Sequence, residues 1–244
     1  MLVCAEERSR GVTIDVGLNY FETPTKRVTL LDAPGHKDFV PNMITGAAQA
    51  DCALLMVDST VGEFETGLTD DGQTKEHTVL LRSLGVEHLV VVVNKLDMVN
   101  YSQERFDFIV DEMRKFLKQA GYKGECSDLF HLISHHGDQA RAVRFIPVSG
   151  FQGENLVQRT DERLCCWYSG QTLLEAIDCF EAPQRSVDGP FRMCVSDVYR
   201  NIPLGLACSG KVESGLVGVG DNVLTPRFTS ALSNLCAAVS HSWV

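Results

Sequence analysis

Two short polar segments, each directly after an apolar run, carry the residue types in this chain that are best suited to chemistry. One is DAPGH at residues 32–36, and the other, 62 residues further along, is NKLD at residues 94–97. Apolar runs of this kind predict buried strands. Residues that follow such strands lie at their carboxyl ends, where open α/β sheets bind ligands. We therefore expect both segments to border a binding site.

The first segment offers groups for a metal ion and for a terminal phosphate. The Asp32 carboxylate can hold a water bound to Mg²⁺, an ion that keeps much of its water shell. Gly35 lets a backbone N–H approach a phosphate oxygen that a Cβ could obstruct. His36 is then placed to orient an attacking water. Asp-x-x-Gly alone is often only a turn, but the whole pentapeptide after an apolar strand favours a phosphate site.

The second segment offers groups for a guanine base. The Asp97 carboxylate can accept two hydrogen bonds, from guanine N1–H and from the exocyclic amine. Adenine has no such pair of donors, so a buried Asp97 would be left unpaired, a mismatch that can discriminate by several orders of magnitude. Lys95 can lay its methylene stem along the base and ribose. Asn94 can tie neighbouring loops together. The segment predicts guanine-nucleotide binding.

Two weaker signals lie elsewhere in the chain. Ser149, Gly150 and Phe151 follow another apolar run, and their backbone N–H groups could approach guanine O6. A Ser-Gly turn after a strand is common, so this signal only supports the others. Thr13 could supply a hydroxyl oxygen to Mg²⁺, although in isolation it is an ordinary threonine.

The elements that must position these residues alternate between strand and helix. Four near-continuous apolar runs predict strands covered on both faces, at residues 27–31, 52–57, 88–93 and 144–148. Helical periodicity occupies residues 73–84, 103–121 and 172–180. Asn100 or Ser102 is expected to cap the longest helix, and Gly121 to follow its end. This alternation predicts an α/β fold with a mainly parallel sheet.

A change of pattern near residues 182–190 predicts a domain boundary. Beyond it, residues 191–198, 205–213 and 221–224 read as strands with glycine turns, as at the start of a small β-barrel. The stretch 227–244 has no clear period and is expected to be a loose tail. Residues 205–212 fit G-x-x-x-x-G-K, but Val212 stands where a phosphate-binding loop needs Ser or Thr, so we expect a strand there.

Composition limits the classes of partner and site. A net charge of −10 argues against binding nucleic acid through bulk electrostatics. The nine cysteines include no C-x-x-C pair, which favours reduced thiols and a cytoplasmic location. The apolar runs are too short to span a bilayer. Cys126, His131, His135 and His136 could be metal ligands, but they lack a known zinc spacing, so a surface loop over 124–143 is the favoured interpretation.

Longer strings around these segments resemble the translational GTPases of the elongation factor 1-alpha and release factor 3 group. They are EERSRGVTIDV at 6–16, DAPGHKDFVPNMITGAAQAD at 32–51, and NKLD. WYSGQTLLEAID at 167–178 favours the Hbs-type ribosome-rescue GTPases, the partners of Pelota. The resemblance covers about residues 6–226. It implies that Thr13 and Asp32 serve Mg²⁺ and that His36 serves the hydrolytic water. It assigns the guanine to Asn94, Lys95, Asp97 and Ser149.

The resemblance also implies a domain organisation. A P-loop-type GTP-binding domain is expected over residues 1–183, the beginning of a translation-factor β-barrel over 184–226, and a divergent tail over 227–244. The family's first strand and glycine-rich phosphate loop find no match before Glu6. The chain is therefore expected to be a fragment of a longer GTPase, with negligible GTP affinity when purified alone.

The function implied is GTP hydrolysis in ribosome rescue or termination, with GTP or GDP and Mg²⁺ as ligands. The partners implied are the ribosome and a Pelota-type release-factor-like protein, without a membrane and without direct nucleic-acid binding by this portion. Two alternatives stay open. One is aminoacyl-tRNA delivery of the elongation factor 1-alpha type, which the sequence at 190–215 disfavours. The other is a non-enzymatic remnant that no longer binds GTP.

Overall fold

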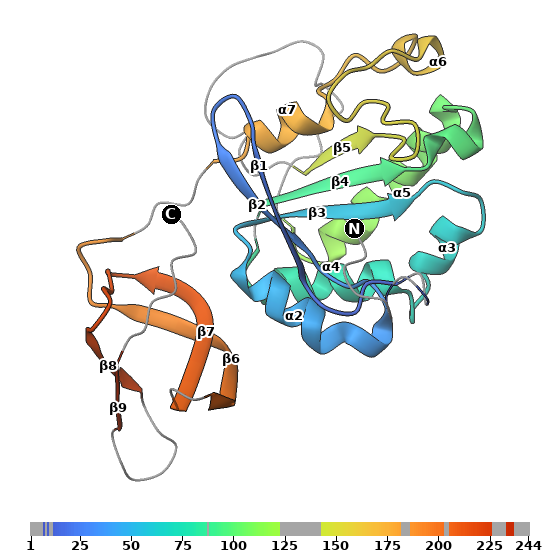
Figure 1. The fold of residues 1–244 in the computed structure, drawn as a ribbon. Helices are drawn as coiled ribbons and strands as arrows, with labels where there is room; N and C mark the ends of the chain where they lie inside the picture. The colour runs from blue at the N-terminus through green and yellow to red at the C-terminus, as the bar shows by residue number, and fades with distance from the viewer. Residues whose placement is uncertain are drawn as a thin grey trace. The chain divides into compact units, whose positions relative to one another are not determined.

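A three-stranded parallel sheet lies at the centre of the larger of two units in the computed structural model (Figure 1). The units are Met1–Ala182 and Pro183–Val244. The structure describes residues 7, 9, 12–86, 88–122, 143–181, 186–202, 205–225 and 233–236.

The parallel sheet has the order β3-β4-β5, with β4 in the middle. Its strands are β3 (Cys52–Asp58), β4 (His88–Asn94) and β5 (Arg144–Pro147). Asp58 pairs with Asn94 in the register, and Val93 pairs with Pro147. The last residues of all three strands therefore lie at one edge of the sheet, and so do the polar segments that follow them.

Helices pack against both faces of the middle strand β4, as expected for the α/β fold. Alternate residues of β4 face opposite ways, so Val91 lies in one buried cluster with Met113 and Val92 in another with Ala176. Met113 belongs to α5 (Gln103–Gln119), which shares its cluster with α4 (Gln73–Ser83). Ala176 belongs to α7 (Leu173–Asp178). The prediction of a parallel sheet is confirmed for these strands, and the prediction of cover on both faces is confirmed for β4.

The long helix α5 begins and ends where its sequence predicts. The Ser102 hydroxyl oxygen accepts a hydrogen bond from the Arg105 backbone N–H at 3.3 Å, as an N-cap should. Gly121 follows the helix with φ +84°, a left-handed conformation that favours glycine. Its buried face carries Phe106, Ile109, Val110, Met113 and Leu117. Ser102, rather than Asn100, is the capping residue.

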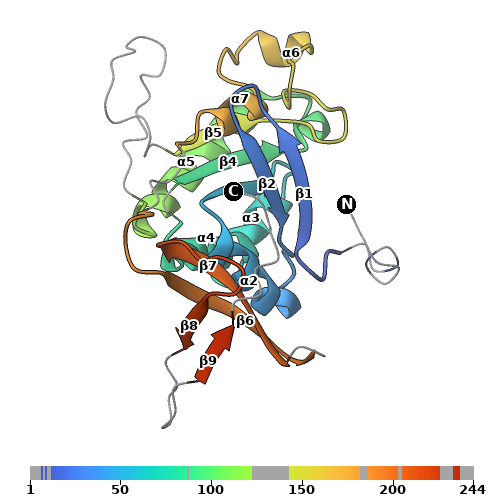
Figure 2. The same cartoon turned by 60° about the vertical axis from the view of Figure 1, so that its left-hand side comes forward.

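The strand expected at 27–31 does not belong to the parallel sheet. It is β2 (Arg27–Asp32), which pairs antiparallel with β1 (Gly17–Glu22) in a separate hairpin. Both views place the hairpin tip beside α7 (Figures 1 and 2). There Thr25 Oγ1 donates to Asp178 Oδ1 at 2.8 Å, and Thr23 and Lys26 also bond to Asp178. The expectation of a strand covered on both faces is wrong here, because three of the six β2 residues are exposed and none is buried.

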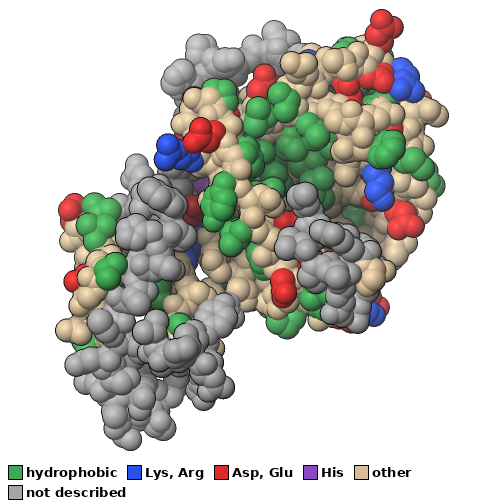
Figure 3. Space-filling view, in the orientation of Figure 1, with side chains coloured by type: hydrophobic (Ala, Val, Ile, Leu, Met, Phe, Trp, Pro, Cys, Tyr) green, Lys and Arg blue, Asp and Glu red, His purple; other side chains and the backbone are tan. Residues whose placement is uncertain are grey.

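β3 is also less covered than its apolar sequence predicts. Among the described residues it pairs only with β4, which makes it an edge strand of its sheet. Met56 of β3 is 52% exposed, whereas Leu55 and Val57 are buried. Figure 3 shows apolar side chains gathered in a hollow on this face of the larger unit. One face of β3 therefore lacks the cover that a central parallel strand has.

Several short elements were not expected from the sequence. They are the 3₁₀ turns η1 (Lys37–Phe39) and η2 (Leu96–Val99), and the helices α2 (Val40–Gln49), α3 (Glu63–Gly67) and α6 (Glu162–Cys165). The two 3₁₀ turns follow DAPGH and overlap NKLD, so they shape both candidate segments.

The smaller unit contains two antiparallel pairs. β6 (Arg192–Ile202) pairs with β7 (Gly205–Ser214), and β8 (Asn222–Thr225) pairs with β9 (Ser233–Cys236). The G-x-x-x-x-G-K match therefore lies in strand β7, as expected. The prediction of a loose tail is wrong at β9, which forms a strand by pairing with β8.

None of the described helices combines the length and hydrophobicity that a bilayer crossing needs. Within the described ranges, no group of three His, Cys, Asp or Glu side chains could hold a metal ion. The candidate ligands Cys126, His131, His135 and His136 lie outside the described residues.

Candidate functional site

Asn94 joins the two loops that the sequence assigns to guanine. It is the last residue of β4, and its side-chain Oδ1 accepts hydrogen bonds from Lys95 N at 2.7 Å and from Gly150 N at 2.9 Å. Gly150 follows β5, which neighbours β4 in the sheet. A Cβ at Gly150 would lie 3.3 Å from Asn94 Oδ1, so a small residue suits this close approach. Asn94 thus ties the neighbouring loops together.

Asp97 is oriented by a fully buried serine. The Ser149 hydroxyl donates to Asp97 Oδ1 at 2.6 Å and accepts from Gln152 N at 3.2 Å. Among the described residues, Asp97 Oδ2 has no hydrogen-bond donor. The carboxylate is therefore fixed by one oxygen, and lone pairs remain on both for a ligand with two adjacent donors, such as the edge of guanine.

Lys95 has a left-handed backbone, with φ +61°, and its ammonium lies 2.6 Å from Asp58 Oδ2. The hydrogen bond and charge of Asp58 raise the pKa of the Lys95 ammonium. Burial by itself raises the pKa of Asp58, but hydrogen bonds from Lys95 and Thr60 outweigh it and hold that pKa below its ordinary value. Both groups are therefore charged at neutral pH.

The loop after β5 limits which amides can reach a base. The Gly150 N–H already donates to Asn94 Oδ1. To reach guanine O6 it would have to leave that acceptor or divide its hydrogen bond between the two oxygens. Phe151 is 94% exposed, and its backbone N–H has no acceptor among the described residues. The Phe151 amide is thus the readier of the two donors.

The DAPGH segment lies between the end of β2 and the start of α2. Asp32 ends the hairpin, and Gly35 approaches α4, since a Cβ at Gly35 would lie 3.8 Å from His77 Cε1. His36 Nδ1 accepts a hydrogen bond from the Asp38 backbone N–H at 3.2 Å. Because Nδ1 accepts, the neutral ring carries its proton on Nε2. The imidazole is 40% exposed and can donate that proton in a hydrogen bond to solvent.

Helix α2 brings the Thr13 segment to the same place. Asn42 Nδ2 donates to Ile14 O, next to Thr13, at 2.8 Å. Gly46 packs so closely that a Cβ there would lie 3.2 Å from Val16 and 3.5 Å from Ala33. The segments that carry Thr13 and Asp32 therefore both lie against α2. A threonine hydroxyl and a carboxylate are hard oxygen donors of the kind that Mg²⁺ prefers, so the chemistry of this pair fits the ion.

The candidate residues thus form two groups. Hydrogen bonds at the sheet edge join Asn94, Lys95, Asp97, Ser149 and Gly150, with Phe151 beside them. Packing on α2 gathers the segments of Thr13 and Asp32, and Gly35 and His36 follow directly. We call the residues at the sheet edge the guanine-side group. Among the described residues, the hydrogen bonds that join the NKLD loop to the loop after β5 involve no residue of the second group.

Two residues of the guanine-side group were missed from the sequence. Asp58 directly follows the apolar residues of β3, as Asn94 does in β4, so the signal that identified NKLD also marks Asp58. Gln152 bonds Ser149 through its backbone and accepts from the Tyr101 hydroxyl through Oε1 at 2.6 Å. No sequence pattern marks Gln152.

Ser149→Ala is expected to lower the free energy of unfolding by about 1–2 kcal/mol, because it removes a buried hydroxyl and its hydrogen bonds to Asp97 and Gln152. Urea denaturation measures the change. Ser83→Ala is the matched control, since Ser83 Oγ bonds only to Val79 O on an exposed helix surface. Equal effects of the two substitutions would contradict a special role for Ser149.

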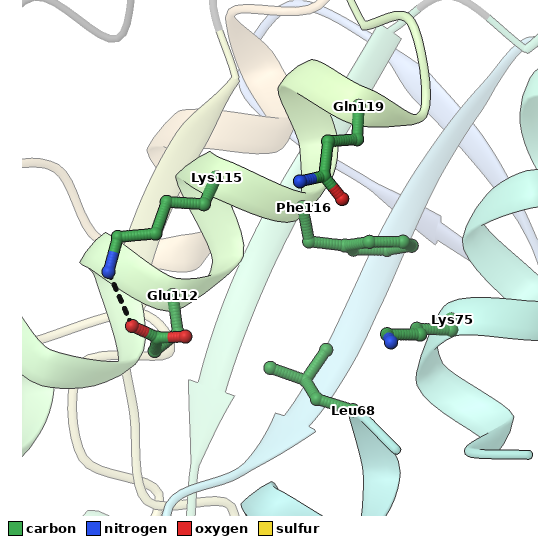
Figure 4. Close-up of a pocket in the computed structure, with 6 residues that line it drawn as sticks. All are labelled: Leu68, Lys75, Glu112, Lys115, Phe116 and Gln119. Carbon is green, nitrogen blue, oxygen red and sulfur yellow. Dashed lines mark hydrogen bonds and ion pairs between the residues drawn. The ribbon is translucent and has the colours of Figure 1, made fainter. Parts of the chain in front are cut away.

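A separate cavity of about 230 Å³ lies between helices α4 and α5 and the α3–α4 connection (Figure 4). Its lining is Leu68, Lys75, Glu112, Lys115, Phe116 and Gln119. Its lysines are already paired, Lys115 with Glu112 at 2.6 Å and Lys75 with Asp70 at 3.1 Å. The cavity includes none of the candidate site residues.

Comparison with known proteins gives two kinds of relative. "Protein HBS1" of Drosophila melanogaster is 53% identical over 220 residues, which are 90% of this chain and 30% of that protein. Elongation factor 1-alpha of Aeropyrum pernix is 44% identical over 221 residues, 90% of this chain and 46% of that protein. The chain thus spans less than half the length of either relative.

Among solved structures, Sup35 complexed with GMPPNP matches 85% of this chain and 45% of its own, with a TM-score of 0.53 and 36% identity. Sup35 complexed with GDP matches 89% of this chain and 50% of its own, with a TM-score of 0.53 and 34% identity. The family model of the elongation factor Tu GTP-binding domain matches residues 2–183. The chain therefore belongs to the family of that GTP-binding domain, within the translational GTPases of the elongation factor 1-alpha and release factor 3 group.

Proposed function

We propose that this chain is the guanine-nucleotide-binding part of a translation factor that hydrolyses GTP in ribosome rescue or termination. The observation that carries the proposal is the oriented Asp97 carboxylate, fixed by buried Ser149 on a loop that Asn94 ties to its neighbour. A carboxylate held in this way matches the two donors of the guanine edge and rejects adenine. Lys95 would lie along the base with its methylene stem.

The second group of residues would serve the phosphate end. Thr13 and Asp32 would hold Mg²⁺, directly or through its waters, and the bound ion would neutralise charge that develops on the phosphates. His36 has its Nδ1 occupied by Asp38, so its Nε2–H would donate a hydrogen bond to the attacking water. The ring would therefore orient the water, which suits a reaction that depends on positioning more than on covalent chemistry.

The assignment to ribosome rescue is supported by sequence identity. The protein named HBS1 is 53% identical to this chain, whereas the elongation factor 1-alpha relative is 44% identical. We infer the ribosome and a Pelota-type release-factor-like protein as partners, and the cytoplasm as the location. Aminoacyl-tRNA delivery and a remnant without GTP binding are the alternatives that the experiments must separate.

The test measures nucleotide binding with fluorescent GDP, on the 244-residue chain and on the product of the longest reading frame that contains it. We expect the product of the longest reading frame to bind GDP in competition with GTP but not with ATP. Failure of both to bind guanine nucleotides would favour the remnant. Hydrolysis stimulated by ribosomes with a Pelota-type protein, and no stable complex with aminoacyl-tRNA, would support rescue over elongation.

A further inference from the structure

An acidic residue outside the NKLD segment holds its lysine. Lys95 Nζ lies 2.6 Å from Asp58 Oδ2. The register of β3 against β4 places Asp58 opposite Asn94, so the carboxylate lies beside the lysine that follows. The Asp58 side chain is 24% exposed and the Lys95 side chain 58%. The pair is thus partly shielded from water, so its electrostatic attraction is stronger than that of a fully exposed ion pair.

The turn after β3 fixes the Asp58 carboxylate. Asp58 Oδ1 accepts a hydrogen bond from Thr60 N at 2.9 Å. The intervening Ser59 N–H donates to Asn94 O at 3.0 Å. A shift of this turn would therefore move both the carboxylate that holds Lys95 and the end of β4 from which Lys95 extends.

Arg105 of α5 holds that turn from the other side. Its Nε donates to Ser59 O at 2.8 Å, and its Nη2 donates to Thr60 O at 3.1 Å. The same guanidinium donates to both oxygens of Glu65, at 2.7 and 3.3 Å. The planar fork of arginine makes these bonds together, which the single ammonium of a lysine cannot do.

The surroundings of Arg105 keep this fork in place. Its guanidinium carbon lies 5.6 Å from the centre of the Phe64 ring and 5.4 Å from that of the Phe108 ring. Its hydrogen bond lowers the pKa of Glu65 to about 2. The Arg105 side chain is only 13% exposed. The guanidinium is thus immobilised by rings, a carboxylate and two carbonyls.

We propose that Asp58, held by Arg105 through the turn at Ser59 and Thr60, is a positioning residue that fixes the Lys95 ammonium and thereby sets guanine-nucleotide affinity. The inference rests on the proposed function, because Lys95 affects affinity only where a guanine nucleotide binds. With its ammonium anchored, the lysine presents its methylene stem in one place. Less side-chain freedom is then lost when the nucleotide binds.

The first test reads the state of Lys95 without any nucleotide. Trace acetylation at a fixed, mildly alkaline pH, quantified by peptide mass spectrometry, reports the fraction of Lys95 that is unprotonated. Asp58→Asn removes the charge that keeps the lysine protonated, so we expect several-fold faster labelling of Lys95. Arg105→Lys loosens the turn and is expected to raise Lys95 labelling as well, by a smaller factor.

Matched controls separate this effect from general loosening. Glu112→Gln breaks an ion pair of the same 2.6 Å length, with Lys115, and should raise labelling of Lys115 but not of Lys95. Arg163→Lys disturbs the 2.7 Å pair with Asp161 and should leave Lys95 unchanged. Far-UV circular dichroism checks that every variant keeps its helices. Unchanged Lys95 labelling in folded Asp58→Asn or Arg105→Lys would overturn the inference.

The second test measures fluorescent-GDP affinity in the longest reading-frame product. Asp58→Asn should weaken binding about two- to fivefold, the range that a partly exposed ion pair can supply. Faster labelling with unchanged affinity would overturn the role in binding. Absence of GDP binding by the unsubstituted protein would contradict the proposed function and the affinity claim together, whereas the labelling result bears on Lys95 positioning alone.

Discussion

Asp97→Asn is expected to weaken GDP binding roughly 10³-fold, because hydrogen bonds to a charged group contribute about 1.5–3 kcal/mol each and two are lost or reversed. The asparagine amide presents one donor and one acceptor, which mismatches guanine and matches xanthine, whose C2 position carries an oxygen. Xanthosine diphosphate should therefore bind the variant better than GDP. Competition titrations of both nucleotides in the longest reading-frame product measure the reversal.

Two contacts in the structure determine how the reversal of nucleotide preference is controlled. Ser149 Oγ donates to Asp97 Oδ1, and an asparagine oxygen can still accept that bond, so the variant is expected to remain folded. Asp161→Asn is a suitable comparison, because Asp161 pairs with Arg163 near the same end of the sheet without joining the two loops. An unchanged preference for GDP in Asp97→Asn would remove Asp97 from base recognition.

His36→Ala is expected to slow single-turnover GTP hydrolysis by about 10²–10⁴-fold, the usual contribution of a side chain that positions or exchanges a proton. Nucleotide affinity should change little, since the ring contributes through the attacking water. Rapid-quench measurement of bound GTP separates the two effects. The comparison uses the longest reading-frame product, with ribosomes present at a saturating level.

His36→Gln serves as the conservative variant for this test. A glutamine amide can still donate a hydrogen bond to a water, so we expect it to recover part of the lost rate. Full activity of His36→Ala would refute the assignment. Equal loss in both variants would instead favour a requirement for the ring itself, which packs 5.9 Å from the centre of the Phe39 ring.

The central elements of the fold could be predicted because their patterns are strong. The run 88–93 has almost no polar side chain and becomes the middle strand β4, where Val91, Val92 and Val93 are completely buried. Helix α5 repeats its apolar residues at helical spacing and carries both end signals. Because NKLD comes at the end of the apolar run 88–93, the sequence correctly predicted that the segment lies at the edge of the sheet.

Other elements depend on contacts that a sequence window does not contain. The run 27–31 looks like a buried strand, but its partner is β1, and the four-residue turn that joins them has its hydrogen bond from Thr23 N to Lys26 O. Apolar character alone cannot distinguish a covered parallel strand from an exposed hairpin strand. β9 has only four residues and exists through pairing with β8, because strand formation depends strongly on context.

The candidate site likewise combines residues that the sequence predicts with residues that depend on distant contacts. Asp97, Asn94 and Ser149 were predicted as candidates because polar residues after apolar runs are visible in the sequence. Arg105 was not, because its interactions with Ser59 and Thr60 join residues 46 and 45 positions apart and follow from how α5 packs beside β3. Supporting contacts of this kind need coordinates.

The attachment of the hairpin tip to Asp178 has a consequence for the order of folding. Thr23 and its acceptor on α7 are 155 residues apart, so the hairpin is synthesised well before the residue that anchors it. At typical synthesis rates the hairpin waits on the order of 10 s before its anchor is made. Since contacts between distant residues form slowly, docking of the hairpin should be a late kinetic phase, after the β4–α5 centre has formed.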